Sequence, residues 1–209
     1  RVYLVAAGKA AWQMAHAARA CLQDNFCGGV VVTKYGHVKG EIANVACFEG
    51  GHPVPDENSL RGTDAALALT EDLTESDTVV FLLSGGGSAL FEKPLLPLAE
   101  LQDVTNQLLA AGADIVEINT IRKRLSAVKG GRFARHCAPA QVFAVVLSDI
   151  LGDPLDMIAS GPAYPDSSSC AQALDIAKRY GLRLSEWAWA LLAQETPKTL
   201  ENVETQITG

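Results

Sequence analysis

A short apolar run is followed by three consecutive glycines in the stretch Thr78-Val79-Val80-Phe81-Leu82-Leu83-Ser84-Gly85-Gly86-Gly87-Ser88-Ala89. The run Thr78–Leu83 predicts a strand buried on both faces of a sheet. Glycine is costly in chain entropy, so three in a row after such a strand indicate more than a connecting loop. The N–H groups of a bare backbone can approach phosphate oxygens, and Ser84 and Ser88 add hydroxyls on either side. The pattern predicts a phosphate-binding loop, with a flexible turn as the alternative.

Similar apolar runs recur along the chain and alternate with helical stretches. Four more are predicted as strands: Val2–Ala6, Gly29–Thr33, Val45–Phe48 and Val142–Leu147. Six stretches have the spacing or end signals of helices: Ala10–Gln23, Asp56–Leu73, Leu98–Ala111, Asp114–Val128, Ser169–Tyr180 and Ser185–Gln194. This alternation predicts an α/β fold: a doubly wound, mainly parallel sheet with helices on both faces, a Rossmann-like three-layer sandwich. In such sheets ligands bind beyond the carboxyl ends of the strands.

The first strand also ends at a glycine, and a lysine follows it. Gly8-Lys9 stands just before the helix Ala10–Gln23, so an ammonium and helix N–H groups can converge there on an anion. An exposed lysine beside a turn is the alternative.

Two common nucleotide-binding motifs are absent from these strand ends. A P-loop needs a glycine and a hydroxyl residue where this chain has Tyr3 and Ala10. The dinucleotide fingerprint G-x-G-x-x-G needs a sixth-position glycine where, counted from Gly85, the chain has Leu90. The second mismatch disfavours a nicotinamide cofactor.

Much of the positive charge lies between Asn119 and Gly131. At the helical spacing of about 100° per residue, Arg122, Ser126 and Lys129 share one face, and Asn119 and Lys123 share another. In an otherwise acidic chain, this local excess predicts a face directed at an anion. A solvated basic face near a helix C-terminus is the alternative.

Two carboxylates, Asp149 and Asp153, follow the strand Val142–Leu147. An acidic residue in that position often holds Mg²⁺ in enzymes that transfer phosphoryl groups. An Asp that caps the next turn is the alternative. In the proline-rich loop 51–56, His52 has no ligand-spaced partner, and a lone loop histidine is more often structural than catalytic.

Composition narrows the function classes. The 209 residues suffice for one large domain. The chain has 17 Lys+Arg and 24 Asp+Glu, which gives a net charge of −7, and it contains no block of like charges. Nucleic-acid binding is therefore not expected. The apolar runs are too short for a membrane-spanning helix of roughly 20 residues, which predicts a soluble protein without a membrane partner. Five scattered cysteines without a CxxC pair favour the reducing cytoplasm over a disulfide or zinc scaffold.

Taken together, these segments resemble the glycerate 2-kinase family, whose C-terminal half is called the MOFRL domain. The resemblance spans nearly the whole chain in six ordered motifs: Gly8-Lys9-Ala10, 51–56, 83–89, Asn119 with 122–131, 147–149 with 152–154, and Ser160-Gly161-Pro162. Members transfer the γ-phosphoryl group of ATP to the 2-hydroxyl of glycerate, giving 2-phosphoglycerate and ADP, with Mg²⁺. Many members carry the name hydroxypyruvate reductase.

The resemblance implies that residues 1–209 are the N-terminal α/β domain of a two-domain kinase with its active site in the cleft between the domains. The start at Arg1, which is not a methionine, is consistent with an excerpt of a longer protein. A leading helical segment and the C-terminal MOFRL domain, an intramolecular partner, would then be missing, and the excerpt alone would be nearly inactive. Homo-oligomer formation stays open.

On this interpretation each strand-end group has a role in phosphoryl transfer. The predicted catalytic residues are Lys9, Lys123 and Asp149. Asp149 or Asp153 would hold Mg²⁺, directly or through water, or would orient the attacking 2-hydroxyl. Ser84, Gly85, Gly86, Gly87 and Ser88 would bind the ATP phosphates, and Asn119, Arg122 and Lys129 would bind glycerate. Two alternatives remain: an NAD(P)H-dependent hydroxypyruvate reductase, and a non-catalytic module that binds sugar phosphates.

Overall fold

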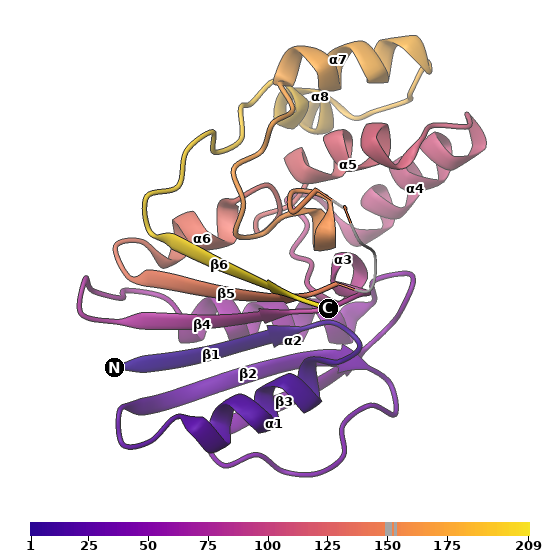
Figure 1. The fold of residues 1–209 in the computed structure, drawn as a ribbon. Coiled ribbons are helices and arrows are strands. Elements are labelled where there is room, and N and C mark those ends of the chain that lie inside the picture. Colours follow the sequence, from indigo (N-terminus) through magenta and orange to yellow (C-terminus); the bar gives the residue numbers. More distant parts are fainter. Residues whose placement is uncertain (149–151, 153) are drawn as a thin grey trace.

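A computed structural model of the chain describes residues 1–148, 152 and 154–209. Its centre is a six-stranded parallel sheet in the order β3-β2-β1-β4-β5-β6 (Figure 1). The strands are β1 Val2–Ala7, β2 Phe26–Lys34, β3 Val45–Gly50, β4 Thr78–Leu83, β5 Gln141–Leu147 and β6 Val203–Thr208. The predicted α/β class is confirmed, and the order reverses between β1 and β4. All the strands run the same way, so their carboxyl ends meet at one edge.

The helices were largely expected from the sequence pattern. They are α1 Ala11–Cys21, α2 Glu57–Leu69, α3 Gly87–Leu90, α4 Leu98–Ala110, α5 Ile115–Arg124, α6 Arg132–Cys137, α7 Cys170–Arg179 and α8 Glu186–Leu192, with a 3-10 turn at Ile158–Ser160. Asp56 caps α2, because its carboxylate accepts the N–H groups of Asn58 and Ser59. Among the residues described, no helix has the length and apolar character to cross a membrane.

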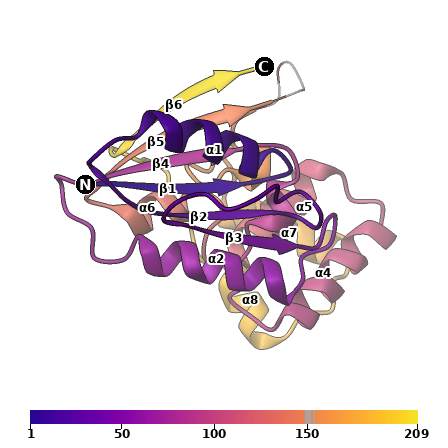
Figure 2. The same ribbon diagram turned by 90° about the horizontal axis from the view of Figure 1, so that it is seen from below.

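Apolar side chains on the two faces of the sheet form separate cores. On one face, Val5 of β1 and Phe81 of β4 pack with Ala66 of α2 and Phe133 of α6. On the other face, Leu4 packs with residues of α1. Figure 2 shows α1 and α2 on opposite sides of the strands. Helices therefore cover both faces, as the alternating pattern predicts.

A third core lies among α4, α5, α7 and α8. Leu101, Leu108, Ile121 and Leu192 are buried there and lie in neither of the two sheet cores. These four helices form a group beside β4–β6 (Figure 1). The group fixes the position of α5, which brings its basic residues toward the carboxyl edge of the sheet.

The predicted helix Asp114–Val128 is wrong in its last turn. Helix α5 ends at Arg124, because the following residues pair with an extended segment: Leu95 N–H donates to Leu125 O (2.9 Å) and Ala127 N–H donates to Lys93 O (2.8 Å). Arg122, Ser126 and Lys129 therefore do not share a helix face. The elements β6, α3 and α6 were not predicted from the sequence.

Candidate functional site

The loops after β1 and β4 are joined into one surface at the reversal of strand order. Ser84 N–H donates to Ala7 O (3.0 Å), and Lys9 N–H donates to Gly85 O (2.8 Å). Gly8 has φ +122° and approaches Ser84 so closely that a Cβ would lie 2.2 Å from the Ser84 Oγ. Only glycine fits that approach. The two strand ends that the sequence pattern singled out are therefore one site.

Lys9 extends from this surface with a free side chain. It is exposed, and its ammonium has no ion pair or hydrogen bond with any residue that the structure describes. Its backbone is fixed, since its carbonyl oxygen accepts the Thr33 hydroxyl (3.4 Å) and lies 2.9 Å from the His37 Nδ1. A positive charge on a fixed backbone, without an internal partner, is suited to an external anion.

The loop formed by residues 84–88, called the glycine loop below, has a backbone conformation and close contacts that require glycine. Gly86 has φ +87°, and a Cβ on Gly87 would lie 2.7 Å from the Ala159 Cβ. A Cβ on Gly85, by contrast, would enter open space. The backbone N–H groups of residues 85–88 have no acceptor among the described residues. Four consecutive free donors beside Lys9 form a surface that can bind phosphate oxygens.

Ser84 differs from the rest of the loop because its hydroxyl faces inward. Its side chain is buried, and its Oγ accepts the N–H of Ala10 (3.1 Å) just before α1. The bond satisfies one of the unpaired donors at the start of that helix. Ser84 thus anchors α1 to the loop, and the structure does not place its hydroxyl on the free surface.

A strained turn packs behind the glycine loop. Ala159, Ser160 and Gly161 have φ values of 51°, 61° and 60°, and the first two are not glycine. Left-handed non-glycine residues cost about 1–3 kcal/mol each and are concentrated at functional sites. The turn is held in place because Gly130 N–H donates to Ser160 O (2.9 Å) and Gly131 N–H donates to Gly161 O (2.8 Å).

Through this turn, Asn119 connects to the glycine loop. The Ser160 hydroxyl donates to Asn119 Oδ1 (3.1 Å) and lies 3.4 Å from the Ser88 hydroxyl. Asn119 is buried, and its amide donates to the Met157 sulfur (3.6 Å). The contacts place Asn119 behind Ser88 and Ser160.

Arg122 and Lys129 meet at a buried carboxylate that the sequence reading did not select. Glu92 is fully buried, and its Oε2 lies 3.5 Å from both the Arg122 Nη2 and the Lys129 Nζ. Among the described residues, neither Glu92 oxygen accepts a hydrogen bond. Lys129 also donates to Ser88 O (2.7 Å) and Phe91 O (3.1 Å), and Arg122 donates to Ser88 O (3.3 Å). The three charges therefore support the end of the glycine loop from inside.

Lys129 should make stability depend on pH in the alkaline range. Burial lowers the pKa of Lys129 to about 8, although the negative charge of Glu92 acts to raise it. An exposed lysine has a pKa of about 10.4. Between these values the unfolded chain binds more protons than the folded one, so the free energy of unfolding rises with pH. We expect the stability difference between wild type and Lys129→Met, measured by urea unfolding, to be flat below pH 7 and to shift in favour of wild type from pH 8 to 10. A flat difference across the whole range would contradict this pKa.

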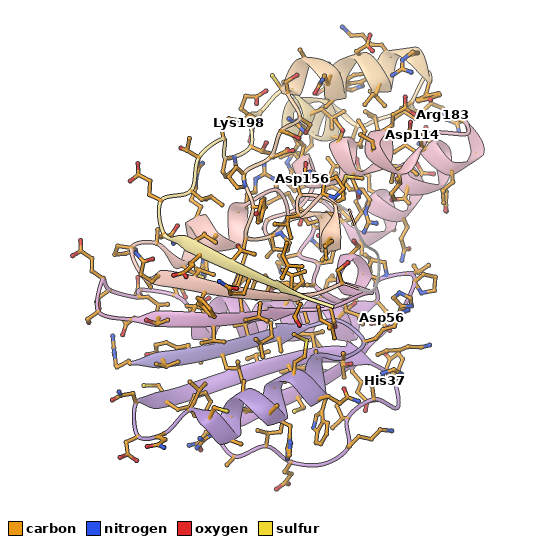
Figure 3. All side chains as sticks on the ribbon, viewed as in Figure 1. His37, Asp56, Asp114, Asp156, Arg183 and Lys198 are labelled. Atoms are coloured by element: carbon orange, nitrogen blue, oxygen red, sulfur yellow. The ribbon has the colours of Figure 1, made fainter. Side chains whose placement is uncertain are left out.

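Lys123 lies in a second, separate ionic network. Its ammonium is 3.2 Å from the Asp166 carboxylate and 3.4 Å from Asp156, whose place near α5 is labelled in Figure 3. Asp166 also accepts the Thr196 hydroxyl (2.7 Å) and pairs with Arg124. Lys123 is buried. These contacts join α5 to the segment that leads into α7, and they do not bring Lys123 to the surface shared by Lys9 and the glycine loop.

His52 does lie at that surface. A Cβ on Gly86 would be 3.0 Å from the His52 Cδ2, 3.1 Å from its Nε2 and 3.2 Å from the Lys9 Cγ. The imidazole and the lysine stem thus flank the same glycine. One sequence signal could have identified His52: it stands in the proline-rich segment Gly-His-Pro-Val-Pro, which fixes the backbone around it. We interpreted that segment as structural.

The predicted metal ligands are not in the part of the chain that the structure describes. Asp149 and Asp153 both lie outside it. Within the described ranges, no three His, Cys, Asp or Glu side chains come together in a group that could hold a metal ion. The residues described therefore do not form a magnesium site by themselves.

A cavity of about 600 Å³ lies at the opposite edge of the sheet. It is lined by Glu75, Arg135, Gln141 and Asn202, at the amino ends of β4, β5 and β6. In parallel α/β sheets, ligands bind beyond the carboxyl ends of the strands. The candidate site is therefore the surface formed by Lys9, His52 and the glycine loop.

The close contact behind the glycine loop gives a stability prediction with an internal control. Gly87→Ala would place its methyl group 2.7 Å from the Ala159 Cβ, which overpacks the turn and should cost about 1–3 kcal/mol in the free energy of unfolding. Gly85→Ala adds the same methyl group into open space and should stay within about 0.5 kcal/mol of wild type. Urea unfolding measures both. Equal costs at the two positions would show that the Ala159 contact is not what requires Gly87.

Comparison with known proteins gives consistent matches. Residues 1–193 match the family model described as "Domain of unknown function (DUF4147)". The D-glycerate 2-kinase of Thermotoga maritima is 56% identical over 100% of this chain and 51% of its own length. An Agrobacterium vitis relative, provisionally named a hydroxypyruvate reductase, is 43% identical over 96% of this chain and 47% of its own length.

The fold matches as closely as the sequence. The crystal structure of Thermotoga maritima glycerate kinase superposes with a TM-score of 0.96, at 56% identity, over 99% of this chain and 50% of that one. The chain spans about half the length of the curated relatives it matches.

Proposed function

This chain belongs to the DUF4147 family, the N-terminal domain of the glycerate kinases, and from that premise we propose that it is the N-terminal domain of a glycerate 2-kinase. The reaction is transfer of the ATP γ-phosphoryl group to the 2-hydroxyl of glycerate. The observation that carries the proposal is the unpaired Lys9 ammonium beside the four free N–H groups of residues 85–88. A C-terminal MOFRL domain, for which the relatives are long enough, would complete the site.

The chemistry of phosphoryl transfer suits this surface. Catalysis of this reaction consists mostly of positioning and of stabilising charge on the transferred group. The N–H groups of residues 85–88 hold phosphate oxygens, and Lys9 neutralises the charge that develops during transfer. These donors are fixed before any ligand arrives, since backbone hydrogen bonds join the two loops.

The other predicted residues receive roles according to their contacts. Arg122 keeps a partly exposed side chain beside Ser88, and with Asn119 it is proposed to orient glycerate. Lys129 and Lys123 are buried and paired, so their proposed role is support of the loop and of α5. Ser84 supports the start of α1 in the same way.

Magnesium would supply charge neutralisation at the phosphates when bound. Its proposed ligands remain Asp149 and Asp153, outside the described residues.

An assay of the longer protein tests the function. We expect the protein that contains this chain and its C-terminal domain to release ADP from ATP only when glycerate is present, with 2-phosphoglycerate as the product by NMR. The 209-residue chain alone should be inactive or nearly so, because the complete site needs both domains. Full turnover by this chain would contradict the two-domain site.

The same preparation tests the two alternatives. A hydroxypyruvate reductase would consume NADH with hydroxypyruvate, a prediction that the mismatch at Leu90 disfavours. A binding module would retain sugar phosphates without releasing ADP. ADP release that requires glycerate, without NADH consumption, supports the kinase over both.

A further inference from the structure

We propose that His52 is a catalytic residue of the kinase reaction, whose Nε2 accepts the proton of the attacking hydroxyl of the substrate. This inference rests on the proposed function and adds a residue to its site. Neither the family matches nor the lone position of His52 in the sequence assigns it a role.

The first observation is the place of the imidazole. His52 and Lys9 come from different loops, yet both contact Gly86, at the centre of the free N–H groups. A phosphoryl group held by those N–H groups and by Lys9 would therefore have the imidazole beside it. A hydroxyl that attacks the phosphorus from that side would then lie within reach of the ring.

The second observation is that His52 differs from the other histidines of the chain. His37 is held by its Nδ1 contact with the Lys9 carbonyl (2.9 Å), and His136 by its Nε2 contact with the Leu67 carbonyl (3.0 Å). His16 stacks on Trp12 with ring centroids 5.0 Å apart. The His52 ring nitrogens have no partner among the residues that the structure describes. A structural histidine normally uses them, so His52 is available to a ligand.

The third observation is that the backbone on either side of His52 is held in a tight turn. A Cβ on Gly51 would lie 2.5 Å from the Val54 carbonyl oxygen and 3.0 Å from the Asp56 carboxylate, so the turn is tight. Asp56 in turn accepts the Tyr35 hydroxyl (2.7 Å) and caps α2. Figure 3 shows Asp56 and His37 at this carboxyl edge of the sheet. A catalytic base needs such a fixed position.

The charges around the ring keep it in the form that accepts a proton. Burial, followed by the positive charges of Lys9 after β1 and Lys34 at the end of β2, lowers the pKa of His52. The acidic groups of the neighbouring elements, Glu49 and Asp56, are bound to backbone N–H groups and to Tyr35. His52 is therefore neutral at pH 7 and has a lone pair available.

The step balances as a simple displacement. The O–H bond of the 2-hydroxyl breaks, and its proton goes to the His52 Nε2 while the oxygen forms a bond to the γ-phosphorus. The bond between that phosphorus and the bridging oxygen breaks, and ADP leaves with the electron pair. The imidazolium is half-exposed, so it returns its proton to solvent.

The test compares pH profiles of the longer protein. For His52→Gln we expect kcat to fall by roughly 10²–10⁴-fold with little change in KM, and the acidic limb of the kcat profile to disappear. For His52→Ala, added imidazole should restore part of kcat. His16→Gln, which removes a histidine far from the site, should behave as wild type, and circular dichroism should show all variants folded.

Two different failures can be told apart. If wild type releases no ADP from glycerate, the proposed function is wrong, and the role of His52 with it. If wild type is active but His52→Gln retains its acidic limb, or raises KM at unchanged kcat, then His52 contacts substrate without accepting the proton, and this inference alone is overturned.

Discussion

Lys9→Ala should lower the kcat of the longer protein by roughly 10²–10³-fold, the loss typical of removing one donor that stabilises charge in the transition state. The Lys9 ammonium has no partner among the described residues, so its removal leaves no buried group unpaired. The fold should therefore remain intact, with an unchanged melting temperature. Steady-state release of ADP and thermal unfolding measure the two quantities.

Lys178→Ala is the matched control for that variant. Lys178 is exposed on α7, outside the candidate site, and its removal changes the net charge by the same amount. We expect it to change kcat little, because it takes no part in the surface formed by Lys9, His52 and the glycine loop. Near-wild-type turnover of Lys9→Ala, or equal losses at both positions, would remove Lys9 from the mechanism.

The fold was predictable where burial produces continuous apolar runs. Such runs identify the central strands β1 and β4 because both faces of each are covered. Strand β6 was missed because it lies at the edge, and its sequence Val203-Glu204-Thr205-Gln206-Ile207-Thr208 alternates with polar residues that face solvent. Local patterns do not show whether a polar, alternating segment will find a partner strand.

The end of α5 was mispredicted for a different reason. Residues 125–128 are compatible with a helix by propensity, and nothing local stops it before Gly130. The helix ends at Arg124 because residues 125–127 pair with 93–95, a contact that only the tertiary structure supplies. This single difference rearranges the basic residues, since a helix would have placed Lys129 one turn after Ser126 on an outer face.

The site was predictable in its backbone and less so in its side chains. Gly8 and the glycine loop could be found because glycine has few other reasons to follow a buried strand. The sequence does not distinguish Lys9, which is exposed and unpaired, from Lys123 and Lys129, which are buried and paired. Their counter-ions are distant in the sequence: Asp166 is 43 residues from Lys123, and Glu92 is 129 − 92 = 37 residues from Lys129.

The sequence, with its net charge of −7, suggested that the basic segment faces an anion, and the structure gives that segment a different role. Most of the basic side chains in that segment form ion pairs inside the protein, with the buried carboxylates of Glu92 and Asp166. Lys9, after β1, is the cation that lies beside the free N–H groups of the loop, and its ammonium has no partner among the described residues. On the proposed function, those backbone donors and that ammonium would bind an anion, a combination that composition does not reveal.

Lys129→Met should be the most destabilising of the variants considered, at a cost of roughly 3–5 kcal/mol at pH 7. The substitution leaves the fully buried Glu92 carboxylate with Arg122 as its single ionic partner and leaves Ser88 O without its shortest donor. Glu92→Leu should be costly for the reciprocal reason, because it leaves the buried Lys129 ammonium uncompensated. Urea unfolding of the chain, followed by tryptophan fluorescence, measures both.

The double variant Glu92→Leu/Lys129→Met decides between ionic pairing and simple packing. Replacing both members of a buried pair by apolar groups removes the desolvation cost together with the attraction, so the double variant should be more stable than the sum of the single losses, with a coupling of about 0.5–3 kcal/mol. Arg122 is partly exposed and still donates to Ser88 O, so it tolerates the loss of Glu92 better than Lys129 does. Strict additivity would mean that Lys129 acts only through the carbonyls of Ser88 and Phe91, and that the carboxylate does not hold the loop.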